Sequence, residues 1–153
     1  MKSFKYLFLS CFFCVFIGNA QVGINTDDPK STLDINGNLS LKVVTLNGGP
    51  GGSAMAIDDG TYINLSPTTG NVEFILPDAT AYPGRIYIMR NISDTETALI
   101  YSLGGSFFPG DSRVATAAPI SMTPDVAGDA GDVTKTLIYV SDGVNWTYGK
   151  LGF

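Results

Sequence analysis

The chain has 153 residues, with nine lysines and arginines, fourteen acidic residues, no histidine and a formal net charge of −5. Nucleic acid and anionic membranes are poor partners for such a chain, because binding to phosphate backbones relies on clustered Lys and Arg. The absence of histidine removes the most common general base and metal ligand, so a Ser-His-Asp triad is excluded.

Residues 1–20 are typical of a secretory signal peptide. Lys2 and Lys5 precede the apolar run from Tyr6 to Ile17, and small residues follow up to Ala20. The run is shorter than the ~20 residues that a membrane-spanning helix needs. We therefore expect cleavage after Ala20 in preference to a retained anchor, and no membrane insertion afterwards. Export would place the protein in the periplasm, on the cell surface or outside the cell.

Both cysteines, Cys11 and Cys14, lie in this leader. The remaining 133 residues carry seven basic and fourteen acidic side chains, a net charge of −7. The exported chain can form no disulfide, so one modest core or association between chains must stabilise it.

Residues 21–46 are predicted to form a separate N-terminal segment. Within it, a two-residue turn at Asn36-Gly37 would put the neighbouring apolar residues on opposite faces. The apolar residues share one face either if Asn36 to Asn38 form a three-residue loop or if the strand runs straight through. Both alternatives stay open. All the apolar residues concerned are odd-numbered: Leu33, Ile35, Leu39, Leu41 and Val43.

A glycine-rich stretch, residues 47–60, is predicted to be a flexible connector to a β domain at residues 61–153. It resembles a phosphate-binding loop only superficially, because it lacks the Lys-Ser or Lys-Thr that follows in such loops and opens no helix.

Strand patterns dominate the chain after the leader, and no helical periodicity is found there. Short runs rich in Val, Ile, Tyr, Phe and Thr alternate with Gly, Pro, Asn and Asp, which predicts an all-β fold, either an antiparallel sandwich or a fibre-type domain. The runs at 85–91 and 136–141 are apolar on both faces, so we expect central strands covered on both sides. The predicted strands are 39–46, 61–65, 72–76, 85–91, 97–102, 119–122, 136–141 and 145–149.

The last two strands are predicted to form a hairpin. A two-residue turn at Asp142-Gly143 would pair Tyr139 with Trp146 and Leu137 with Tyr148, with the large residues on one face.

The stretch VGINTDDPKSTLDINGNL resembles the pattern V-G-I-G-T-x-x-P-x-x-x-L-D-V-x-G, which follows the signal peptide in many secreted flavobacterial proteins and occurs in phage tail-fibre-like proteins. Asn25 stands where Gly is commoner. The later stretches 74–91 and 137–149 are more loosely similar to fibre-type β domains. The resemblance implies a trimeric surface fibre or adhesin in which the opening segment serves assembly. The matching residues are Val22, Gly23, Ile24, Thr26, Pro29, Leu33, Asp34, Ile35 and Gly37.

Several side chains are candidates for a site. Asp125, Asp129 and Asp132 lie in a glycine-rich loop and could offer carboxylates to calcium, although their spacing is that of an ordinary acidic turn. An exposed Trp146 or Tyr148 could stack on a sugar ring, but the hairpin parity favours packing of Trp146 into the core.

A pair of carboxylates for glycoside hydrolysis can be imagined from Asp58-Asp59 with Glu73 or Asp78, but residue type alone supports it. No cofactor is predicted.

Two functions from different classes follow. The first is a non-enzymatic, self-associating surface protein, with a homotrimer expected from the resemblance. The second is a monomeric β-sandwich that binds carbohydrate, with surface glycans as partners.

Overall fold

The computed structural model describes residues 22–24, 33–124 and 135–150. The chain divides into two units, residues 1–40 and 41–153. The boundary after residue 40 lies earlier than the expected one at residue 46, because β3 (Val43–Leu46) belongs to a sheet of the second unit.

The first unit contains two short strands, β1 (Val22–Ile24) and β2 (Leu33–Ile35), which pair in parallel with Val22 opposite Leu33. Both strands come from the segment that resembles tail-fibre-like proteins. The structure supports neither alternative for residues 36–38, because β2 ends at Ile35 and no strand covers residues 36–42.

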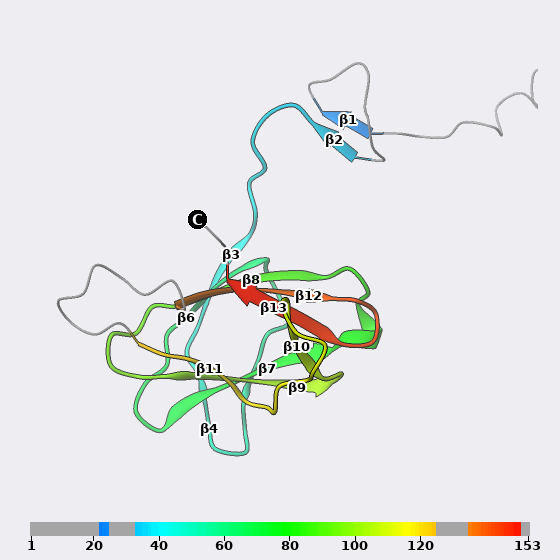
Figure 1. The fold of residues 1–153 in the computed structure, drawn as a ribbon. Helices are drawn as coiled ribbons and strands as arrows, with labels where there is room; N and C mark the ends of the chain where they lie inside the picture. Colours follow the sequence, from blue (N-terminus) through cyan, green and yellow to red (C-terminus); the bar gives the residue numbers. More distant parts are fainter. Residues whose placement is uncertain (1–21, 25–32, 125–134, 151–153) are drawn as a thin grey trace, which may run out of the picture. The chain divides into compact units, whose positions relative to one another are not determined.

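The second unit consists of two mixed sheets, so the all-β prediction is confirmed while the purely antiparallel pairing is wrong. The six-stranded sheet has the order β10-β13-β12-β8-β6-β3, and the other has the order β11-β9-β7-β4 with β5 also pairing with β7. Figure 1 shows β8 and β12 in one layer and β7 and β9 in the other. In chain order the elements after β3 are β4 (Gly49–Pro50), β5 (Met55–Ala56), β6 (Tyr62–Leu65), β7 (Asn71–Asp78), the 3-10 helix η2 (Ala79–Ala81), β8 (Ile86–Asn91), β9 (Ala98–Gly104), β10 (Phe107–Pro109), β11 (Ile120–Met122), β12 (Thr136–Ser141) and β13 (Trp146–Lys150).

The parallel pairs arise because the chain alternates between the layers. β6 and β8 pair in parallel within one sheet, and β7 and β9 do so within the other. Two parallel neighbours need a crossover connection, and here each crossover is a strand of the opposite sheet.

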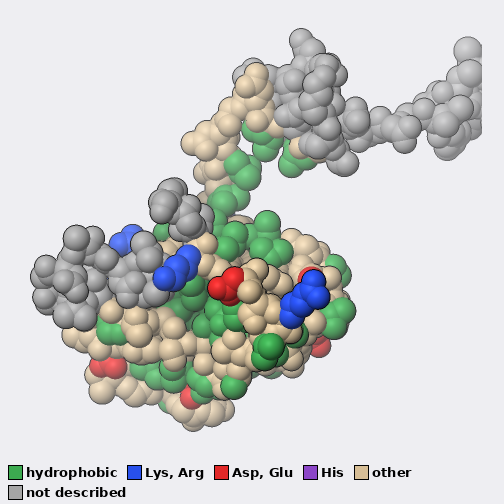
Figure 2. Space-filling view, in the orientation of Figure 1, with side chains coloured by type: hydrophobic (Ala, Val, Ile, Leu, Met, Phe, Trp, Pro, Cys, Tyr) green, Lys and Arg blue, Asp and Glu red, His purple; other side chains and the backbone are tan. Residues whose placement is uncertain are grey.

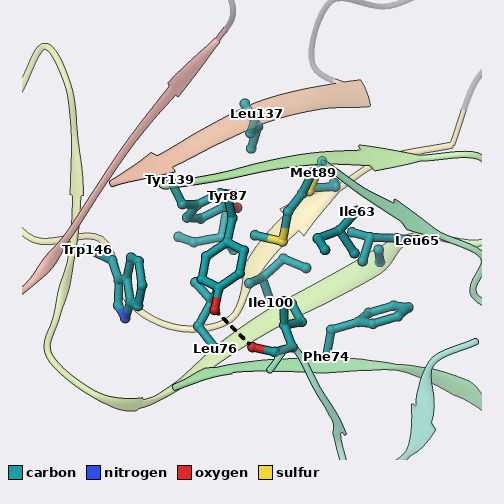
Figure 3. Packing of buried hydrophobic residues seen from close by; sticks show 14 of the residues in the cluster. Ile63, Leu65, Phe74, Leu76, Tyr87, Met89, Ile100, Leu137, Tyr139 and Trp146 are labelled. Atoms are coloured by element: carbon teal, nitrogen blue, oxygen red, sulfur yellow. Dashed lines mark hydrogen bonds between the residues drawn. The ribbon is translucent and has the colours of Figure 1, made fainter. Parts of the chain in front are cut away.

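The core lies between the two sheets and follows the period of two that strands impose. In β6, β8 and β12 every second residue is buried. Figure 3 shows these side chains converging, with the Tyr87 hydroxyl donating to the Ile57 carbonyl at 3.3 Å. Because Ile57 is only 1% exposed and β4 and β5 lie in residues 47–60, that stretch is part of the fold and not a flexible connector. The largest fully buried side chains are Trp146, Tyr87, Tyr139, Phe74, Phe107, Ile57, Ile63, Leu65, Leu76, Met89, Ile100 and Met122.

β8 and β12 are central in the six-stranded sheet, as expected, but only one of their faces is covered. The second face is half-buried or exposed among the described residues, with Ile86 at 43% exposure. The expectation that both faces are covered is therefore wrong.

The β12–β13 hairpin forms, but its register differs from the predicted one by two residues. Tyr139 pairs with Tyr148 and Ser141 with Trp146. The Asp142 carboxylate explains the shift, because it accepts hydrogen bonds from the backbone N–H groups of Val144 and Asn145 at 2.8 and 2.6 Å. The turn is thus centred one residue later than expected. A shift of two leaves every side chain on its predicted face.

Candidate functional site

A groove opens where the core reaches the surface between the edges of the two sheets. It lies among β10 and β13 of the six-stranded sheet, β11 of the other sheet, and the loop that joins β10 to β11, and its volume is about 640 Å³. The floor is apolar and is made by Pro109, Pro119, Ile120, Leu137 and Tyr148.

Tyr148 is held in this groove by three neighbours. Its ring stacks on Tyr139, with centroids 5.7 Å apart and planes at 20°, and meets Phe107 edge-on at 6.3 Å. Its hydroxyl donates to Thr116 Oγ1 at 3.0 Å. A half-buried ring fixed in this way is a preorganised surface, since it loses little rotamer freedom when a ligand binds.

The loop from β10 to β11 is tied to β13 and to β10 by one backbone hydrogen bond each. The Gly110 N–H donates to the Tyr148 carbonyl at 2.7 Å, and the Thr116 N–H donates to the Phe107 carbonyl at 2.7 Å. These bonds place Thr116 at the groove margin. The other polar side chains of the margin are exposed and come from three separate stretches: Asp111, Ser121 and Lys150.

The two predicted aromatic site residues have different positions. Trp146 is 0% exposed, and its indole N–H donates to the Pro77 carbonyl at 3.1 Å, so it offers no surface for a sugar. Tyr148 is half-buried and lines the groove. Packing of Trp146 into the core agrees with the parity argument.

The stretches that resemble fibre-type domains meet in space. Ser141 donates to the Ala79 carbonyl at 2.7 Å, next to the bond from Trp146 to Pro77.

The buried Asn91 amide donates to two carbonyls, those of Glu96 and Met122, each at 2.9 Å. Buried polar groups need such partners, so these motif residues hold the fold together.

The acidic candidates do not assemble into a described site. Asp125, Asp129 and Asp132 lie outside the described residues. Within the part of the chain that is described, no group of three acidic side chains is placed to hold a metal ion.

The carboxylates considered for glycoside hydrolysis are bound to different partners. Asp59 pairs with Lys42, and this bond lowers the pKa of the Asp59 carboxyl. Asp78 caps η2 by accepting from Thr80, which lowers the pKa of Asp78.

The uncovered side of the six-stranded sheet carries an apolar cluster, which we call the outer face: Val43, Tyr62, Ile86, Ile88, Ile138 and Val140. The neighbouring row on the same side is polar, since Asn64 pairs with Arg90 and Arg90 with Thr136. Strand register aligns Val43 with Tyr62, Tyr62 with Ile88, and Ile88 with Ile138 in one row across the sheet. Val43 is 59% exposed. Figure 2 shows hydrophobic side chains reaching the surface of the second unit between scattered charged ones.

No protein-family model, curated protein or solved structure matches this chain. The described residues contain no helix with the length and apolar character needed to cross a bilayer.

Proposed function

We propose that this chain is an exported, non-enzymatic surface protein that self-associates, as a homotrimer, through the outer face. The observation that carries the proposal is the row from Val43 through Tyr62 and Ile88 to Ile138, which leaves contiguous apolar surface in water. Large apolar patches of this kind on soluble proteins mark interaction sites.

Exposure of apolar residues near the start of the second unit supports the same proposal. Leu41 is 36% exposed, beside Val43. In the first unit, Leu33 and Leu39 are 53% and 57% exposed. Four of the eleven large apolar side chains that the described residues leave exposed thus lie within residues 33–43. Two of these four, Leu33 and Leu39, lie in the stretch that resembles tail-fibre-like proteins, and their exposure favours this stretch as a second element of assembly.

A second copy is the occupant we favour for the outer face because an antiparallel pair, β8 and β12, lies at its centre. Three such faces can meet around a threefold axis, where the apolar side chains of each copy pack against those of the other two. Full burial of one Ile is worth about 1.5–3 kcal/mol. Ile88 and Ile138 are already half-buried, so we assign them about 1 kcal/mol each at every interface.

The test is the solution mass of the chain from Gln21 onward, measured by light scattering after size exclusion over a range of concentrations. We expect a trimer for the unchanged chain. The double variant Ile88→Thr/Ile138→Thr should weaken each interface ~30-fold, since 1.4 kcal/mol is tenfold in an equilibrium constant, and should shift the mass towards a monomer.

The matched control is Leu103→Ser, which removes an apolar side chain that is 70% exposed on the other sheet. It should leave the mass unchanged. A monomer for the unchanged chain at every concentration would contradict the proposal, and so would dissociation by the control substitution.

A further inference from the structure

We propose that the groove between β10, β11 and β13 binds a neutral saccharide, with Tyr148 as the stacking surface. The inference goes beyond self-association and does not depend on it, because a single chain supplies the whole groove. The volume of about 640 Å³ lies within the range of small-molecule sites, about 300–1,000 Å³.

The ring of Tyr148 is suited to stacking on the C–H face of a sugar. Tyr139 stacks on this ring, Phe107 meets it edge-on and Pro109 is its cross-strand neighbour on the other side, and the ring together with Pro109 lines the groove. The hydroxyl of Tyr148 is already bonded to Thr116. An amphipathic ring with its polar end satisfied favours a ligand that has both an apolar face and polar edges.

The margin supplies the hydrogen-bonding groups that a polyol needs. Asp111 accepts, Lys150 donates, and the hydroxyl of Ser121 does both. Each hydroxyl of a sugar is likewise a donor and an acceptor, so it can bond to any of the three.

The balance of charge at the margin selects among ligands. Among the described residues that line the groove there is one carboxylate and one ammonium group, so these residues form no cluster of one sign to attract an anion or a cation. A wholly apolar ligand would cover Asp111 and Lys150 without giving them partners, which is unfavourable. A neutral saccharide fits both the apolar floor and the polar margin.

The experiment is saturation-transfer NMR on the chain from Gln21 onward, with neutral di- and trisaccharides at millimolar concentration. An acidic sugar and a long-chain alcohol serve as comparison ligands. We expect signals from at least one neutral saccharide and none from the acidic sugar or the alcohol.

Two variants locate the site. Tyr148→Ala should abolish binding, while Asp111→Ala should raise the dissociation constant about tenfold, as expected for a lost hydrogen bond to a charged group. Because Asp111 is exposed, its removal tests binding without disturbing the core. Asp58→Ala, which removes an exposed carboxylate that does not line the groove, is the matched control and should bind as the unchanged chain does.

Three results would overturn the proposal: no binding of any neutral saccharide, equal binding by the Asp111→Ala variant, or binding of the alcohol alone. The last result would assign the groove to an apolar ligand. If the chain is a trimer and binds no saccharide, the proposed self-association stands and the saccharide site is wrong. If the chain is a monomer and binds a saccharide, the site stands and the proposed self-association is wrong.

Discussion

Replacing Tyr139 with Phe should stabilise the protein, because the Tyr139 hydroxyl is buried and has no hydrogen-bond partner among the described residues. A buried, unpaired hydroxyl costs about 1–3 kcal/mol. Phe keeps the ring, and the gap left by one oxygen costs less than the ~1 kcal/mol typical of a lost buried methylene. We expect the free energy of unfolding to rise by about 1 kcal/mol, a gain of about 4 °C in Tm for a domain of this size.

The matched control is Tyr87→Phe, one strand away, since Tyr87 pairs with Tyr139 in the sheet. The Tyr87 hydroxyl donates to the Ile57 carbonyl at 3.3 Å and accepts from Arg85 at 3.4 Å. Its loss should lower the free energy of unfolding by about 1 kcal/mol. Urea unfolding followed by circular dichroism measures both variants. If Tyr139→Phe destabilises the chain as much as the control does, its hydroxyl is bonded and the reasoning is wrong.

Alkaline titration gives a second measure of the same group. Burial raises the pKa of Tyr139 above its ordinary value of 10.0. Because the folded-state pKa lies above the unfolded value, this group leaves the free energy of unfolding at its full value below pH 10. The free energy of unfolding then falls as the pH rises further, since only the unfolded chain loses the proton readily. In the Tyr139→Phe variant, the fall in unfolding free energy above pH 10 should therefore be shallower than in the unchanged chain.

Three further predictions follow from turns and core. Trp146→Ala should lower the free energy of unfolding by about 3–5 kcal/mol, since the side chain is 0% exposed; acrylamide should barely quench the native Trp fluorescence, and strong quenching would contradict its burial. Hydrogen bonds from the turn lower the pKa of Asp142, so its contribution is present above the unfolded pKa and lost as the pH falls through the folded pKa; Asp142→Ala should flatten the acid limb of stability against pH, and an unchanged limb would count against this role. Gly105→Ala should destabilise the fold more than Gly70→Ala when both are unfolded in urea, because both glycines have positive φ but only at Gly105 would the new methyl lie 2.6 Å from the Val144 carbonyl.

Strand positions in the second unit could be predicted from local pattern, and pairing could not. Each of the eight predicted runs overlaps a strand of the structure, because alternation and β-branched residues act within a few residues. The short strands β4, β5 and β10 are not predicted, since two or three residues around Gly and Pro carry no periodicity. The parallel pairs are a property of the connections between sheets, which no single run encodes.

The hairpin shows that a sequence signal can identify a turn correctly and still place its centre one residue too early. Asp142-Gly143 fits a tight turn, yet the Asp142 side chain bonds to two backbone N–H groups and moves the turn on by one residue. The burial of Trp146 could be predicted from parity, which is insensitive to this shift.

The groove could be predicted only in part. Tyr148 was a candidate because of its aromatic ring, whereas Asp111 and Thr116 lie in a loop that carries no motif. They reach the groove through backbone bonds to β10 and β13, two strands far apart in the sequence. A polar margin of this kind depends on tertiary structure.

The alternation of β6, β7, β8 and β9 between the two layers affects how this unit folds and which truncations it can tolerate. Because consecutive strands belong to opposite sheets, neither sheet can form its parallel pairs before the other begins to form. Pairing of this non-local kind makes folding slow and favours an all-or-none transition. Between residues 62 and 104 every parallel pair has a strand of the opposite sheet between its two members, so we expect no smaller segment of this region to fold alone.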